Sequence, residues 1–164
     1  MTVIERFRND TTHVYSDATD LVWERTFDAT REQVWKAFTD RELIPRWWGP
    51  HGTTTTVVEM DVRVGGKWRY INHAPDRADV PFMGEYLAVD PPKSFTWTFI
   101  VDIDGMRDHG GRESFTFEEV GAQTKLTSRS HFPSMEELEG MLATGMIKGG
   151  VETWDRFAAL LAEG

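Results

Sequence analysis

Residues 41–70 read RELIPRWWGPHGTTTTVVEMDVRVGGKWRY and contain the pattern that decides the fold: a helical segment, an abrupt stop and two strands. Neighbouring side chains point in different directions in a helix or a strand, so Trp47 and Trp48 cannot share one face. Gly49 and Pro50 end the helix, because proline lacks an amide donor and disfavours the helical region for its predecessor. The indoles therefore lie at a chain reversal, where one enters the core and the other covers the rim or lines a ligand pocket.

Length and charge limit the classes of protein to consider. The chain has 164 residues, enough for one domain with a substantial core. Its 18 basic and 27 acidic side chains give a net charge of −9, which disfavours binding to nucleic acid or to an anionic membrane surface. It has no cysteine, no secretion signal and no segment with the ~20 apolar residues of a membrane span. We therefore expect a soluble, cytoplasmic protein.

Sequence patterns divide the chain into an N-terminal extension and one domain. Residues 1–18 are polar and weakly patterned, so we expect one added edge strand there at most. The domain, residues 19–164, opens with an alternating strand over 21–27. A helix follows that begins at Thr30, where Gln33 completes a capping box.

A second short helix is expected over residues 40–48, and strands follow from there to Phe132. Glycine, proline and Asp-Gly turn signals separate these strands. Together with the first strand they make about seven. Their expected positions are 53–60, 67–72, 82–89, around 95–99, around 115–117 and 124–132.

The end of the chain predicts a long C-terminal helix. Ser134 caps its start, with Glu137 three residues later as a second capping box. The apolar stripe changes direction near Gly145, Gly149 and Gly150, and each glycine weakens a helix by about 1 kcal/mol relative to alanine. We therefore expect a kink or an interruption at these glycines.

Four tracts resemble the SRPBCC or START-like superfamily, and within it the group related to the activator of heat-shock protein 90 ATPase. They are FDATREQVWKAFTDRELIPRWWGP, MDVRVGGKWRY, GEYLAVDPPKSFTWTF and FTFEEVGAQTKLTSRSHFPS. The resemblance covers residues 19–161 and extends to polyketide cyclases and an enediyne-resistance protein. It implies an α+β helix-grip fold of the START/Bet v 1-like type, with a curved antiparallel sheet of about seven strands, two short helices and a long C-terminal helix. It also implies a cavity between sheet and long helix for a hydrophobic small molecule.

Aromatic side chains that share strand faces are the main candidates for the wall of such a cavity. Aromatic stripes on strands also form ordinary cores, so the pattern alone does not separate the two roles. The candidates are Trp68, Tyr70, Phe95, Trp97, Phe99, Phe115 and Phe117.

Polar candidates come from the last strand and the last helix. Ser128 and Ser130 alternate with Leu126, so their hydroxyls face the same interior and could orient a ligand or bond to the backbone. Glu152 and Arg156 are four residues apart and could form a charged patch in the cavity, or a solvated pair on the helix surface. We expect Glu152 to be the polar anchor, and Met141, Gly145 and Gly149 to share the helix face that borders the ligand.

Several kinds of chemistry find no support in the sequence. The five histidines lack metal-ligand spacing, and no nucleophile elbow or phosphate loop is present. Residues 102–113 resemble a calcium loop faintly, but Met106 and Arg107 stand where a ligand and the glycine belong, so we interpret the loop's acids as solvated. We expect no metal and no cofactor, and we assign no catalytic residue.

Three functions fit the resemblance, because one fold can serve several. The first is binding of a hydrophobic or aromatic small molecule by a monomer or homodimer. The second is an enzyme of cyclase or hydrolase type on the same scaffold, which we favour less. The third is a protein-interaction module like the chaperone activators.

Overall fold

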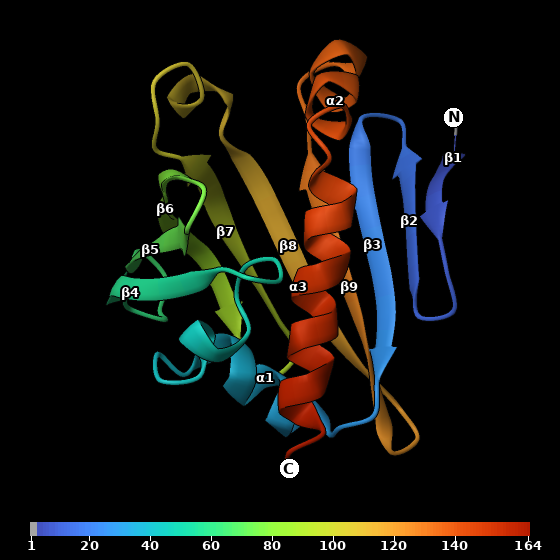
Figure 1. The fold of residues 1–164 in the computed structure, drawn as a ribbon. Helices are drawn as coiled ribbons and strands as arrows, with labels where there is room; N and C mark the ends of the chain where they lie inside the picture. The colour runs from blue at the N-terminus through green and yellow to red at the C-terminus, as the bar shows by residue number, and fades with distance from the viewer. Residues whose placement is uncertain (1–2) are drawn as a thin grey trace.

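The computed structural model describes residues 3–164 as one antiparallel sheet of nine strands with a helix across its concave face (Figure 1). The strands lie in the order β1-β2-β3-β9-β8-β7-β6-β5-β4. Their bounds are β1 Val3–Arg8, β2 Thr12–Asp17, β3 Asp20–Phe27, β4 Thr54–Met60, β5 Lys67–Ala74, β6 Arg77–Asp90, β7 Ser94–Val101, β8 Gly111–Val120 and β9 Gln123–His131. The helices are α1 Arg31–Thr39, η1 Ile44–Arg46, η2 Arg107–His109, α2 Met135–Leu142 and α3 Met146–Leu161.

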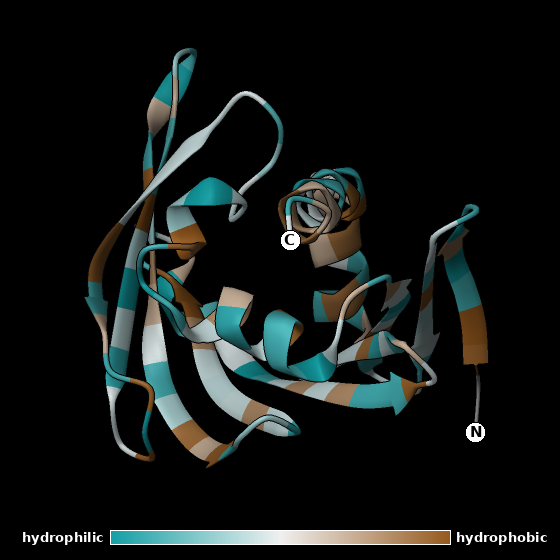
Figure 2. Ribbon diagram, turned by 90° about the horizontal axis from the view of Figure 1, so that it is seen from below, coloured by the Kyte–Doolittle hydropathy of each residue, from teal (hydrophilic) through white to brown (hydrophobic). Residues whose placement is uncertain are grey.

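This arrangement is the expected α+β helix-grip fold. Seen along α3, the sheet curves around the helix (Figure 2), and buried apolar side chains of both elements belong to one hydrophobic core. The sheet has nine strands rather than about seven, because the seven expected within the domain form as β3 to β9 and residues 3–17 add two more, where one at most was expected.

The N-terminal hairpin is hard to recognise from hydropathy. In β2 the buried side chains are Thr12, Val14 and Ser16, so two of the three inward positions carry hydroxyls. In β1, at the edge of the sheet, Val3 and Ile4 are exposed. Alternation of burial is present in β2, but it is not an alternation of apolar and polar residues.

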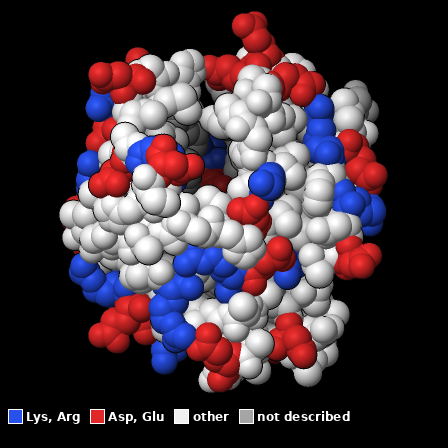
Figure 3. All heavy atoms as spheres, viewed as in Figure 1, with Lys and Arg blue, Asp and Glu red and all other residues white. Residues whose placement is uncertain are grey.

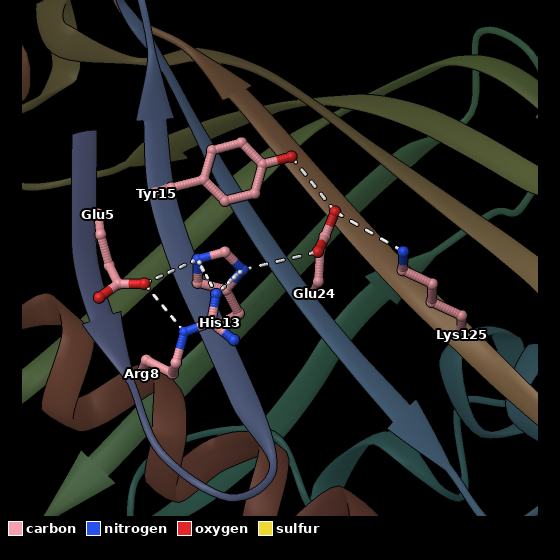
Figure 4. A network of polar contacts seen from close by, with 6 residues as sticks. All are labelled: Glu5, Arg8, His13, Tyr15, Glu24 and Lys125. Atoms are coloured by element: carbon pink, nitrogen blue, oxygen red, sulfur yellow. Dashed lines mark hydrogen bonds and ion pairs between the residues drawn. The ribbon is translucent and has the colours of Figure 1, made fainter. Parts of the chain in front are cut away.

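Polar contacts hold the hairpin to the rest of the sheet (Figure 4). Arg8 pairs with Glu5 at 2.9 Å, and His13 lies between the carboxylates of Glu5 and Glu24, at 3.4 and 3.8 Å. Tyr15 donates its hydroxyl to Glu24 over 3.2 Å. These side chains link β1 and β2 to β3.

Helix α1 begins as expected, whereas the second short helix does not form. The Thr30 hydroxyl oxygen accepts a hydrogen bond from the Gln33 backbone N–H at 3.2 Å, and the Gln33 side-chain oxygen accepts one from the Thr30 backbone N–H at 2.8 Å. The expected helix over 40–48 is wrong, because that segment contains only the short 3-10 turn η1 with Pro45 in its first turn. Proline is tolerated there but cannot continue as an interior helical residue.

The C-terminal helix is interrupted, as the glycines predict. Helix α2 ends at Leu142, and α3 starts after Gly145, whose φ of 84° requires the left-handed region that glycine favours. Only half of the second expected capping box forms. Ser134 accepts from the Glu137 amide at 3.1 Å, but the Glu137 carboxylate contacts His109 at 2.9 Å instead of turning back.

Adjacent glycines in α3 have opposite surroundings. A Cβ atom added to Gly150 would stand 2.5 Å from the indole of Trp23, which is buried and packs on Trp154 with ring centroids 5.5 Å apart. A Cβ atom added to Gly149 would meet nothing within 4 Å. The helix therefore approaches the sheet most closely at Gly150 and leaves space beside Gly149.

We expect Gly150→Ala to lower the free energy of unfolding by about 1 to 3 kcal/mol, because the methyl group overpacks against Trp23 and outweighs the gain in helix propensity. Gly149→Ala is the matched control and should raise stability by up to about 1 kcal/mol. Urea unfolding of both variants measures the difference. Equal stability of the two would show that Trp23 does not limit the approach of α3.

Candidate functional site

The two adjacent tryptophans both border the larger cavity but differ in burial. Trp47 is buried, donates its indole N–H to the Ala37 carbonyl at 2.9 Å and packs on Phe157 with centroids 4.5 Å apart. Trp48 is half-buried and borders the interior cavity together with Gly49 and Pro50. The chain reversal at this position therefore supplies part of the cavity wall as well as the corner of the fold.

A cavity of about 360 Å³ lies between the sheet and α3. The space-filling view shows a hollow in the upper centre of the molecule, beside the position that α2 and α3 occupy in Figure 1 (Figure 3). Helix α3 contributes one face at helical spacing, made by Met146, Gly149, Gly150, Thr153 and Trp154. The remaining wall is formed by Trp23, Phe38, Trp47, Trp48, Gly49, Pro50, Asn72, Arg77, Phe82, Trp97, Phe99, Glu113, Phe115 and Ser128.

A second cavity of about 280 Å³ adjoins the first. It extends towards α2 and the connection between β7 and β8, where His109 and Glu137 link the two segments at 2.9 Å. Four residues border both cavities and therefore mark their junction. The four are Phe82, Phe99, Glu113 and Met146.

Glu113 brings a carboxyl group into this aromatic interior. Strand register places it between Trp97 on β7 and Ser130 on β9, its direct neighbours on the two adjacent strands. The Trp97 indole N–H donates to one carboxylate oxygen at 2.8 Å, and the Ser130 hydroxyl donates to the other at 3.2 Å. The row of three side chains thus forms a small polar site within a largely apolar cavity.

Burial controls the ionisation of Glu113. The protein around its carboxyl desolvates that group, and the residue as a whole is half-buried where it borders the cavities. Desolvation raises the pKa of Glu113 above its ordinary value of 4.5, while the hydrogen bonds from Trp97 and Ser130 oppose this rise. A carboxyl with such a pKa in a cavity is a candidate functional group.

The interpretation of Glu113 as a solvated loop acid is therefore wrong. It belongs to β8, where it lies two and four residues from the inward-facing Phe115 and Phe117. Alternation along the strand could have identified it, because positions 113, 115 and 117 share one face of the sheet.

The expected site residues divide into three groups. Trp97, Phe99, Phe115, Ser128 and Gly149 border the larger cavity. Phe99, Ser130 and Met141 border the smaller one. The third group borders neither cavity and consists of Trp68, Tyr70, Phe95, Phe117, Gly145 and Glu152.

Core residues of the third group support the wall from behind. Trp68 stacks on Trp97 with centroids 4.0 Å apart and an interplanar angle of 16°, and its indole N–H donates to the Thr98 carbonyl at 3.1 Å. Tyr70 is fully buried against Trp68 and Trp48, and desolvation raises the pKa of its hydroxyl. Trp68 thereby fixes the orientation of the indole that Trp97 presents to Glu113.

Glu152 and Arg156 hold the chain reversal instead of pairing inside the cavity. Arg156 donates to the Gly49 carbonyl at 2.9 Å, and Glu152 accepts from the His51 amide at 3.2 Å and pairs with Lys148 at 3.6 Å. These contacts correct the expectation that Glu152 anchors a ligand inside the cavity. Its carboxylate contacts His51 and Lys148, and the residue borders neither cavity.

The structure gives no indication of a metal site or a membrane span in the part of the chain that it describes. No cluster of three or more histidine, aspartate or glutamate side chains within residues 3–164 is arranged to hold a metal ion. None of the helices in this range has the length and apolar character needed to cross a membrane.

The curved sheet, the helix across it and the cavities between them define a protein of the helix-grip class. The sequence model of the family described as Activator of Hsp90 ATPase homolog 1-like protein matches residues 28–162, so the chain belongs to this family. No curated protein matches it in sequence.

Solved bacterial structures share the fold. Protein Ms6760 from Mycobacterium smegmatis is similar at 28% identity and a TM-score of 0.83, over 92% of this chain and 96% of that one. A protein from Arthrobacter aurescens has 25% identity and a TM-score of 0.85, over 92% and 91% of the two chains. CalU16 from Micromonospora echinospora has 18% identity and a TM-score of 0.59, over 98% and 83%, which shows likeness of fold alone.

Replacing Glu113 by glutamine should change how stability depends on pH. Because burial raises the pKa of Glu113, the folded protein holds this proton more tightly than the unfolded chain. The contribution of Glu113 to stability is therefore complete below its unfolded pKa and is lost as the pH rises through its folded pKa. A tenfold difference in proton affinity corresponds to about 1.4 kcal/mol.

We therefore expect Glu113→Gln to become more stable relative to the unmodified protein as the pH rises from about 4 to about 8. Glutamine can still accept from Trp97 and donate to Ser130, so the hydrogen-bonded row is kept. Urea unfolding at a series of pH values measures the effect. A stability difference that is constant with pH would contradict the raised pKa.

Proposed function

We propose that this protein binds a hydrophobic or aromatic small molecule in the cavities between the sheet and α3. The observation that supports the proposal is the pair of adjoining cavities, about 360 and 280 Å³ in volume, with aromatic walls and one buried carboxyl at their junction. Ligand sites in proteins have volumes of about 300 to 1,000 Å³ and combine apolar walls with a few polar groups.

An enzyme of cyclase or hydrolase type is the second candidate. The buried carboxyl of Glu113 favours it, because a carboxyl with a raised pKa can serve as a general acid or base. Binding without reaction predicts a ligand that is recovered unchanged, whereas catalysis predicts turnover that Glu113→Gln abolishes. We favour binding, because Glu113 is the single carboxyl among residues 3–164 that borders the larger cavity and its two hydrogen-bond donors are neutral.

Association with a partner protein is a weaker proposal. A pure interaction module would have an interior filled by its own side chains, and this protein has open space there. A cytoplasmic location and a monomeric or homodimeric state complete the proposal, in keeping with the acidic composition and the lack of cysteine.

Ligand binding can be tested with prodan, a neutral naphthalene dye whose emission increases and shifts to the blue in apolar sites. We expect saturable binding to the unmodified protein. Gly149→Leu should weaken it at least about tenfold, because the new side chain extends from the cavity-facing side of α3 into open space.

Gly140→Leu is the matched control for this experiment. Gly140 also lies in a helix with open space around it, but it is exposed and borders neither cavity. It should bind the dye as the unmodified protein does. Equal binding by all three proteins would place the dye outside the cavity, and no saturable binding at all would count against the proposed function.

A further inference from the structure

The carboxylate of Glu113 has unused capacity to accept hydrogen bonds. Each of its two oxygens receives one bond from a protein donor, from Trp97 on one side and Ser130 on the other. An ionised carboxylate offers about four acceptor positions, so roughly two remain free. Because Glu113 borders both cavities, these positions are available to a ligand at their junction.

Glu113 also has no cationic partner among residues 3–164, where no ion pair includes it. Its two protein partners are neutral donors, which do not balance a buried negative charge. Of the basic side chains that border the cavities, the two histidines have acidic partners, whereas Arg77 and Arg112 form no ion pair among residues 3–164, and none of the four bonds to Glu113. Arg77 donates to the side chain of Asn72, His109 pairs with Glu137, His131 pairs with Asp20, and Arg112 is exposed.

Aromatic rings surround this carboxyl. Phe82 and Phe99 border both cavities beside it, and Trp97 and Phe115 border the larger one. The faces of aromatic rings attract organic cations. At the position of Glu113 an unpaired carboxyl beside aromatic rings is therefore complementary in charge to an ammonium group, whereas Arg77, elsewhere on the larger wall, keeps its positive charge.

We propose that the ligand of this cavity is a hydrophobic amine, whose ammonium group bonds to the free acceptor positions of Glu113 while its apolar part fills the aromatic cavities. The proposal rests on the proposed function and names the chemical class of the ligand. An ammonium donor supplies both hydrogen bonds and the missing positive charge, and charge-assisted hydrogen bonds are about twice as strong as neutral ones. An alcohol of the same shape supplies one neutral donor only.

Three probes with the same naphthyl group test the proposal: naphthylethylamine, naphthylethanol and naphthylacetate, measured by isothermal titration calorimetry at neutral pH. We expect the amine to bind at least about tenfold more tightly than the alcohol, and the anionic acetate to bind most weakly. Equal affinity for amine and alcohol, or tighter binding of either other probe, would overturn the amine proposal and leave hydrophobic binding in place. Failure of all three to bind would overturn both.

Glu113→Gln identifies the responsible group. The variant should lose about tenfold in affinity for the amine while its affinity for the alcohol stays within about threefold, because glutamine keeps the hydrogen-bonded row but removes the charge. The alcohol thus reports on the integrity of the cavity in the same variant. An unchanged preference for the amine in Glu113→Gln would assign recognition to another group and overturn the role of Glu113.

Discussion

The packing of α3 on the concave face of the sheet determines the interior of this protein. The distance between the two is set where Gly150 meets the indole of Trp23, and Arg25 of β3 pairs with Asp155 of α3 at 2.6 Å. The next residue of α3, Arg156, holds the chain reversal at Gly49. The same helix therefore closes the cavity, sets its depth and positions the loop that forms part of its wall.

The cavity combines features that are unfavourable for stability with features that favour recognition. A well-packed core would fill this space and would exclude an acidic side chain. Here Glu113 is retained in the centre of an aromatic face, with Trp97 held in position by its stacking on Trp68. Local departures from good core design are expected at functional sites, where stability is exchanged for binding.

Most of the architecture could be predicted from the sequence, because its signals are local. The cap at Thr30 and the break at Gly145 depend on a few neighbouring residues. The two strands of the N-terminal hairpin could not be predicted from hydropathy, since Thr12 and Ser16 are buried without being apolar. A pattern of alternating apolar and polar residues is absent from strands whose inward positions carry hydroxyl groups, so such strands are not predicted from hydropathy.

The site was less accessible to prediction than the fold. Trp97, Phe99 and Phe115 are at the cavity and Trp68 and Phe95 are behind it, although all five show the same alternation. Which ring faces empty space depends on the curvature of the sheet and on the rotation of α3, and neither is encoded locally. Glu113 was missed because it follows acidic loop residues in the sequence. Glu152 was misplaced because the rotation of the last helix about its axis had to be assumed.

Glu113 lies between the two cavities, and this position restricts the shape of any molecule that fills both. Phe82, Phe99 and Met146 border the same junction, so a molecule extending to either side would place its polar group at its middle and an apolar arm in each cavity. Most amphiphiles instead carry the polar group at one end. Such a molecule would bring its polar group to the junction and fill only one of the two cavities.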